Sequence, residues 1–206
     1  MQKIFLFPLN LVIYPGSSYP LHIFEERYKK MINLCLNNNN GFGIITRVSE
    51  DSSKIGTFVE ITQVIKKYPD GKLDIIVKGI RRFVVVSTET NSDGYIIADT
   101  HPYYDLIFDV DRKIVEAVFN KFVDVLQKIN LKLDPAYWEN LNKTPIKSFK
   151  IAEKTGLTLE QQNKLLIIQD ETQRLNYLID HLEKLEKYLT ESAAVKEIVI
   201  RDGYLN

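Results

Sequence analysis

The side chains best able to do chemistry in this sequence are one cysteine and three histidines. Cys35 is the only thiol, and the histidines are His22, His101 and His181. A nucleophilic thiol needs a nearby base or positive charge, but Cys35 lies on the apolar face of a predicted helix. Metal-binding histidines recur at short spacings, whereas these three are far apart. The pattern predicts a buried thiol and no metal site.

Motifs for phosphate binding and acyl transfer are also missing. No G-x-x-x-x-G-K-[ST] loop occurs, because Gly71-Lys72 falls in a predicted hairpin. No G-x-S-x-G elbow is present. Glu25-Glu26 suits the positive end of a helix, and His22, beside an apolar run, is predicted to be a hydrogen-bonded structural histidine. We expect no catalytic residues, no cofactor and no enzymatic activity.

Composition narrows the class of protein. A chain of 206 residues holds one large domain or two small ones. Basic and acidic residues number 27 each, so the basic excess typical of nucleic-acid binders is absent. One cysteine allows no intrachain disulfide, no secretory signal is found, and no run approaches the roughly 20 apolar residues of a membrane span. We expect a cytoplasmic protein without membrane attachment, and nucleic acid is disfavoured as a partner.

The first hundred residues alternate turn signals with β-branched and aromatic runs. Runs that are apolar on both faces, such as 75–77 and 83–86, predict strands buried in a small closed or half-closed barrel. Gly79 between them predicts a bulge or bend. Apolar residues from Phe24 to Cys35 recur at helical spacing and predict one amphipathic helix. Strands are expected over residues 4–7, 42–48, 56–68, 73–77, 82–86 and 95–100.

From about residue 109 the pattern becomes helical. An apolar stripe covers 114–129, and Asp134-Pro135 combines a cap with a first-turn proline. Thr158 with Gln161 predicts a capping box. Leucines from 175 to 189 alternate steps of three and four, which we interpret as a bundle helix because the seam is too short for a stable coiled coil. We therefore predict a β-rich subdomain over 1–105 and a helical bundle over 106–206.

Two stretches of the sequence resemble a known family. The first contains P-L-x-x-x-x-x-P-G over 8–16, P-L-x-I-F-E over 20–25 and R-Y at 27–28. The second contains G-T at 56–57, D-G at 70–71 and G-x-x-R-F over 79–83. Both resemble the N-terminal domain of Lon protease. The likeness covers about residues 5–86 and extends to about 190 through a looser match in the helical half, where Gln161-Gln162-Asn163-Lys164 departs from the family pattern.

The resemblance implies an α+β fold, with an N-terminal six-stranded PUA-like pseudo-barrel and one helix, followed by a C-terminal helical bundle. In Lon protease this region recognises unfolded or tagged polypeptides, and later domains supply ATPase and peptidase activity. Because this sequence ends at Asn206, we expect a free-standing substrate-recognition domain. Its expected partners are unfolded or tagged polypeptides, or a separate protease or chaperone, and the sequence indicates no oligomeric state.

The matched residues have structural roles as their first interpretation. Phe24 and Tyr28 are expected to anchor the helix to the barrel. Arg82-Phe83 is expected to end a strand with the ring inside, and Arg27 is expected to pair with a carboxylate.

The leading hypothesis is polypeptide binding in an apolar groove or at an exposed strand edge. It is based on the family resemblance and on tyrosines near predicted loops, since tyrosine offers a large area and a polar tip at little entropic cost. The candidate binding residues are Tyr14, Tyr19, Arg27, Tyr103 and Tyr104.

Two alternatives belong to other classes. RNA binding by the barrel would need basic residues to converge on one face, and its affinity would fall steeply with salt. A small-molecule pocket in the barrel ranks last, because nothing in the sequence selects a ligand. The basic residues in question are Lys66, Lys67, Lys72, Lys78, Arg81 and Arg82.

Overall fold

The computed structural model describes residues 1–46, 54–106 and 110–201. In the last helix, side chains are described as far as Glu191. The chain divides into two compact units. The first contains Met1–Leu106 and Thr158–Gln169, and the second contains Ile107–Leu157 and Asp170–Asn206. Each unit is described by itself.

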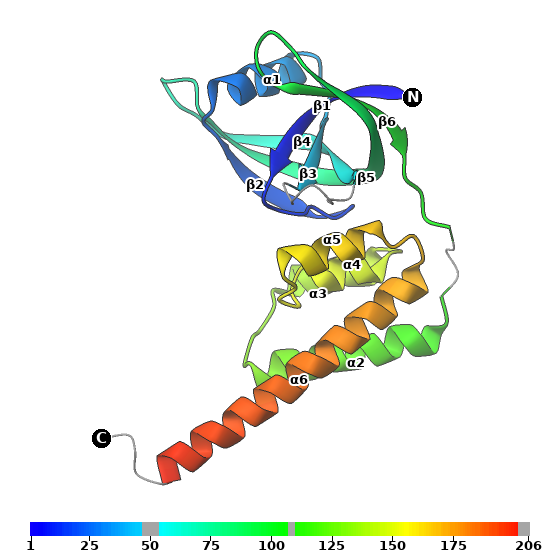
Figure 1. The fold of residues 1–206 in the computed structure, drawn as a ribbon. Helices are drawn as coiled ribbons and strands as arrows, with labels where there is room; N and C mark the ends of the chain where they lie inside the picture. Colours follow the sequence, from blue (N-terminus) through cyan, green and yellow to red (C-terminus); the bar gives the residue numbers. More distant parts are fainter. Residues whose placement is uncertain (47–53, 107–109, 202–206) are drawn as a thin grey trace. The chain divides into compact units, whose positions relative to one another are not determined.

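The first unit is a β-barrel with two helices (Figure 1). Its strands are β1 (Gln2–Leu9), β2 (Ser18–Ile23), β3 (Phe42–Thr46), β4 (Ile55–Lys67), β5 (Leu73–Thr90) and β6 (Ile96–Pro102). Its helices are α1 (Glu26–Asn37) and α5 (Leu159–Ile167). The predicted α+β class is confirmed.

The sheet closes on itself through β5. The strand order is β2-β5-β4-β3-β1-β6, and β5 also pairs with β6. Residues 73–78 of β5 pair with β2, and residues 83–90 pair with β6. Because β4 occupies the other edge of β5, β2 and β6 follow one another along the same edge. Five strands therefore form a closed ring, and β2 lies outside it.

Apolar side chains pack on both faces of this sheet. One cluster includes Tyr28, Met31 and Ile32 of α1 together with Leu21 and Ile23 of β2. The other cluster, Ile4, Leu6, Phe58, Phe83, Val85 and Ala98, comes from strands of the ring. The strands predicted over 73–77 and 82–86 are one continuous strand, so the prediction that Arg82-Phe83 ends a strand is wrong, although the Phe83 ring is buried.

Two sequence expectations at the start of the unit are corrected by the structure. Strand β1 continues through Pro8, which pairs with Ile45 in a parallel ladder. Helix α1 begins at Glu26, so Phe24 precedes the helix and is 58% exposed instead of anchoring it. Tyr28, the other expected anchor, is buried.

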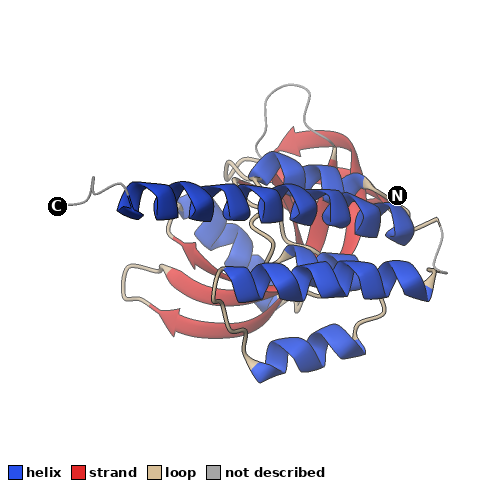
Figure 2. Ribbon diagram, turned by 90° about the horizontal axis from the view of Figure 1, so that it is seen from below, coloured by secondary structure: helices blue, strands red, loops and turns tan. Residues whose placement is uncertain are grey.

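The second unit is a bundle of α2 (Arg112–Lys128), α3 (Pro135–Lys143), α4 (Lys147–Ala152) and α6 (Glu171–Arg201). Helix α2 packs along α6, the longest of the blue helices in Figure 2. The predicted cap at Asp134 is confirmed, because its side chain accepts a hydrogen bond from the Ala136 N–H. In the first unit the predicted capping box of Thr158 and Gln161 is also confirmed.

A buried ion pair joins the helices of the second unit. Arg174 and Glu171 on α6 are paired at 2.9 Å, and both contact Ser148 on α4. The Glu171 carboxylate accepts from the Ser148 N–H and hydroxyl, so it satisfies donors in the first turn of α4. The predicted leucine stripe packs nearby, with Leu175, Leu178 and Leu182 buried.

Candidate functional site

Strand β2 has one edge that is free along its whole length. Among the described residues it pairs with β5 alone, from Ser18–Lys78 to Ile23–Leu73. Its other edge is left without a strand, and an unpaired edge is where an extended chain can add hydrogen bonds.

Aromatic side chains flank both faces of this edge. Tyr19 is 45% exposed and has the parity of the buried residues Leu21 and Ile23, at the end of the strand where that face opens. Phe24, of the opposite parity, is more exposed. A chain lying along the edge would therefore meet an aromatic ring on each side.

A polar and aromatic cluster supports Phe24 on the outer face. His22 Nδ1 lies 2.6 Å from Asp74 Oδ1, and the Tyr68 hydroxyl donates to Asp74 Oδ2 at 2.7 Å. The His22 ring stacks on Phe24 at 5.9 Å between centroids and meets Tyr68 edge-on at 5.9 Å. Lys66 Nζ lies 4.4 Å from the centre of the Tyr68 ring. We call Tyr19, His22, Phe24, Tyr68 and Asp74 the β2 surface.

The ionisation of this surface is set by its hydrogen bonds. Hydrogen bonds from His22 and Tyr68 hold the pKa of Asp74 below its usual range. The bond to Asp74 raises the pKa of Tyr68, so the phenol stays protonated and keeps donating. The prediction of a hydrogen-bonded His22 is confirmed, and its partner is the residue directly opposite on β5. The arrangement offers stacking and hydrogen bonding, with no nucleophile.

Two of the five predicted binding residues are directed to the same element. The Tyr14 hydroxyl donates to the Gln162 carbonyl at 3.3 Å, and the Tyr103 hydroxyl donates to the Ile167 carbonyl at 2.8 Å. Both hydroxyls therefore hold α5 within the first unit. Tyr14 is buried.

None of the other three residues donates a side-chain hydrogen bond to α5 in the described part of the chain. Arg27 pairs with Glu25 at 2.7 Å, as expected, and lies over the Tyr28 ring. Tyr104 is 69% exposed, and its carbonyl accepts from Gln169. Only Tyr19 belongs to the β2 surface. Peptide contact at each of the five residues stays a prediction.

The sequence interpretation missed Phe24, Tyr68 and Asp74. The signal that links them is the antiparallel pairing of β2 with β5, which places His22 opposite Asp74. That register depends on which strands pair, so the spacing of residues within one strand does not reveal it.

The basic residues considered for RNA binding do not form one set. Arg82 is buried, donates to the Leu166 and Ile168 carbonyls at 2.5 and 2.8 Å, and pairs with Asp105. It is therefore not available to phosphate groups.

The thiol and the histidines form no reactive site in the described part of the chain. Cys35 is buried, and burial raises its pKa to about 12. Within the described ranges, no group of three or more His, Cys, Asp or Glu side chains is placed to hold a metal ion. No helix there is both long and apolar enough to cross a bilayer.

A closed barrel with an aromatic strand edge, joined to a helical unit, defines a two-unit α+β protein. A family model described as the ATP-dependent protease La (LON) substrate-binding domain matches residues 3–184. The chain belongs to this family of substrate-binding domains, which confirms the resemblance described from the sequence.

Related proteins and structures agree with this assignment. A Lon N-terminal domain protein from Xanthomonas campestris superposes with a TM-score of 0.67 at 25% identity, covering 87% of this chain and 98% of that one. The N-terminal domain of Mycobacterium avium complex Lon protease has the same fold, with a TM-score of 0.67 at 17% identity over 88% of this chain and 98% of that one.

Full-length relatives are much longer than this chain. Lon protease of Buchnera aphidicola subsp. Schizaphis graminum is 24% identical over 99% of this chain and 29% of its own length. The chain spans less than a third of the curated Lon proteases that it matches.

Proposed function

We propose that this chain binds polypeptides in extended conformation along the free edge of β2. The observation that carries the proposal is that β2 pairs on one side only and has two exposed aromatic rings of opposite parity, Tyr19 within the strand and Phe24 directly after it. Membership in the substrate-binding family supports a polypeptide as the ligand. Aromatic side chains typically supply most of the binding energy of such a contact.

The chemistry of the surface favours unfolded segments over folded partners. A peptide along β2 would gain main-chain hydrogen bonds at the edge, which are independent of its sequence, and ring contacts with apolar side chains. Pro20 lies within β2 and lacks an N–H. This residue interrupts the edge, which disfavours a long regular ladder between copies of the chain.

The wider role follows from the same proposal. The chain would act by binding alone, because its sequence contains no phosphate loop and no nucleophile elbow. It would work in the cytoplasm as a substrate-recognition module, or as an adaptor to a separate protease or chaperone. Tyr14, Arg27, Tyr103 and Tyr104 are further candidate contacts.

Backbone amide NMR with an unfolded polypeptide tests the proposal. We expect shifts in residues 18–24 and 66–76. Binding by the double variant Tyr19→Ala, Phe24→Ala should be at least about thirtyfold weaker, since each lost ring is worth more than about 1 kcal/mol. Tyr188→Ala is the control, because Tyr188 is also an exposed aromatic residue but lies on α6, in the other unit.

Two results would contradict the proposal. Equal affinity of the double variant and the wild type would exclude the β2 surface as the contact. Shifts with single-stranded RNA that vanish at higher salt, together with none from polypeptide, would instead support the RNA-binding alternative.

A further inference from the structure

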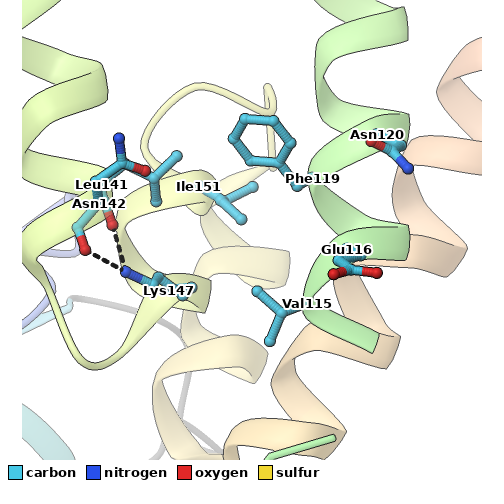
Figure 3. Close-up of a pocket in the computed structure, with 8 residues that line it drawn as sticks. All are labelled: Val115, Glu116, Phe119, Asn120, Leu141, Asn142, Lys147 and Ile151. Carbon is cyan, nitrogen blue, oxygen red and sulfur yellow. Dashed lines mark hydrogen bonds between the residues drawn. The ribbon is translucent and has the colours of Figure 1, made fainter. Parts of the chain in front are cut away.

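The helical unit contains a pocket that is separate from the β2 surface. It has a volume of about 350 Å³ and lies between α2, α3 and α4 (Figure 3). This volume is near the lower end of known ligand sites, so it suits one or two side chains. The lining residues are Val115, Glu116, Phe119, Asn120, Leu141, Asn142, Lys147 and Ile151.

The floor of the pocket is apolar. Leu141 and Ile151 are buried there, while Val115 and Phe119 form a more exposed wall on α2. Figure 3 shows Val115, Phe119 and Ile151 converging on the same space. An aliphatic or aromatic side chain would lose its contact with water on entering this space.

One side of the pocket holds a positive charge. Lys147 Nζ donates to the Leu141 carbonyl at 2.7 Å and to the Asn142 carbonyl at 2.8 Å, the dashed lines of Figure 3. No carboxylate among the described side chains forms an ion pair with it. Because an ammonium has three N–H donors, one donor is left for a ligand.

The surroundings of Lys147 favour an anionic ligand. Partial burial lowers the pKa of its ammonium, and the more distant charge of Glu171 only partly offsets this effect. The two carbonyls are neutral acceptors, so they orient the ammonium without neutralising its charge. A carboxylate here would form a charge-assisted hydrogen bond in partly desolvated surroundings.

The opposite side of the pocket carries a negative charge. Glu116 lies on α2, across the apolar wall from Lys147 in Figure 3, and pairs with Arg112 at 2.9 Å. An anionic group is therefore favoured at the Lys147 end and disfavoured at the Glu116 end. This difference favours one orientation of a ligand in the pocket.

We propose that this pocket binds the C-terminus of a polypeptide whose last residue is apolar. In such a residue the carboxylate and the apolar side chain branch from the same Cα, so one residue satisfies both the Lys147 ammonium and the apolar floor. An internal acidic residue supplies the charge without the apolar group. The ligand class rests on the proposed function, but the pocket is a separate site on the second unit.

The test uses the full chain and two peptides of identical sequence ending in leucine, one a free acid and the other a C-terminal amide. Amide NMR shifts are expected in residues 115–120 and 141–151, with about tenfold tighter binding of the acid, the size expected for a charge-assisted hydrogen bond. Lys147→Met should remove the preference for the acid. Lys143→Met is the control, since Lys143 is at the end of α3 and pairs with Glu139 on the surface.

A second variant separates binding from folding, because Lys147→Met also removes two hydrogen bonds to α3. Val115→Phe fills the pocket and keeps the Lys147 ammonium. In a folded chain it should therefore lower the affinity for the acid peptide at least several-fold. Equal affinity of acid and amide, or shifts confined to the β2 surface, would overturn the inference while leaving the proposed function intact. Binding of N-acetyl-leucine without binding of the acid peptide would contradict the proposal that the ligand is a polypeptide.

Discussion

At the scale of single residues, Arg82 connects several segments of the first unit. Its guanidinium is buried, pairs with Asp105, lies over the Tyr103 ring at 4.9 Å and binds two carbonyls at the end of α5. Removing one partner of a buried ion pair leaves an uncompensated charge in the interior. Arg82 therefore stabilises the attachment of a distant segment of the chain.

Replacing Arg82 with Met should lower the free energy of unfolding by about 3–5 kcal/mol, because the buried Asp105 carboxylate loses its partner. Arg81→Met is the control. Arg81 lies over the Phe58 ring at 4.2 Å and binds Gln2 at the surface, so its loss should change stability by about 1 kcal/mol or less. Chemical denaturation of both variants measures the difference, and similar losses would contradict this role for Arg82.

Cys35 should be inert in the folded chain. Burial raises its pKa to about 12 from an ordinary value of 9.0, and the thiolate is the reactive form. We expect no alkylation by iodoacetamide at pH 8 without denaturant and complete alkylation in denaturant, followed by mass spectrometry. Rapid modification of the native protein would show that the thiol is accessible.

The same pKa shift makes a prediction about stability. Between pH 9.0 and about 12 the unfolded chain releases the Cys35 proton while the folded chain retains it. The unfolded state then binds fewer protons, so the free energy of unfolding should fall with pH in this window. Cys35→Ala should reduce this part of the decline, as denaturation at pH 8 and pH 10 would show.

At the scale of elements, β5 organises the barrel. It is long enough to pair with β2, β4 and β6, and its register with β4 shifts between Phe58 and Val59, opposite Gly79. The predicted bulge at Gly79 is thus confirmed. Gly79 also exchanges hydrogen bonds with the loop before β2, through Gly16 at 2.8 Å and Ser17 at 2.9 Å.

Gly79→Ala should destabilise the first unit by about 1–3 kcal/mol or more, because a Cβ there would lie 2.2 Å from the Tyr14 carbonyl oxygen. Gly16→Ala provides the comparison. Gly16 has a φ of +87° with nothing within 4 Å of an added Cβ, so only backbone strain of about 1–2 kcal/mol is expected. Thermal unfolding measures both, and a smaller loss at Gly79 would mean that the loop adjusts freely.

At the scale of the whole molecule, the chain passes between its two units three times, after residues 106, 157 and 169. Residues 158–169 group with the barrel although they follow most of the helical unit in sequence. Their carbonyls accept hydrogen bonds from Tyr14, Arg82 and Tyr103. The first unit is therefore discontinuous in sequence, and the division into domains at residues 105 and 106 stays a prediction from composition.

A fragment of residues 1–106 should be less stable than the same fragment joined by a Gly-Ser linker to 158–169. Without that segment Arg82 loses two carbonyl acceptors, and unsatisfied buried donors cost about 1–3 kcal/mol each. Circular dichroism with thermal unfolding compares the two fragments. Equal stability would show that the barrel does not depend on α5.

Much of the local structure is predictable from the sequence, because its causes are local. The caps at Asp134 and Thr158 and the buried face of α1 follow from residue types at fixed spacings. The family also follows, since its motifs lie in continuous stretches. Strand β2 was missed, because Pro20 lies within it and proline in a short run disfavours the prediction of a strand.

The sequence by itself determined the α+β class, the family and the absence of the usual catalytic motifs, which all depend on residue types and short spacings. Only the tertiary structure decided which polar and aromatic groups meet. The pairing of His22 with Asp74, the burial of Arg82 against α5 and the pocket around Lys147 all join residues distant in sequence or on different elements. Such contacts arise from the pairing of strands and the packing of helices, which no local pattern encodes.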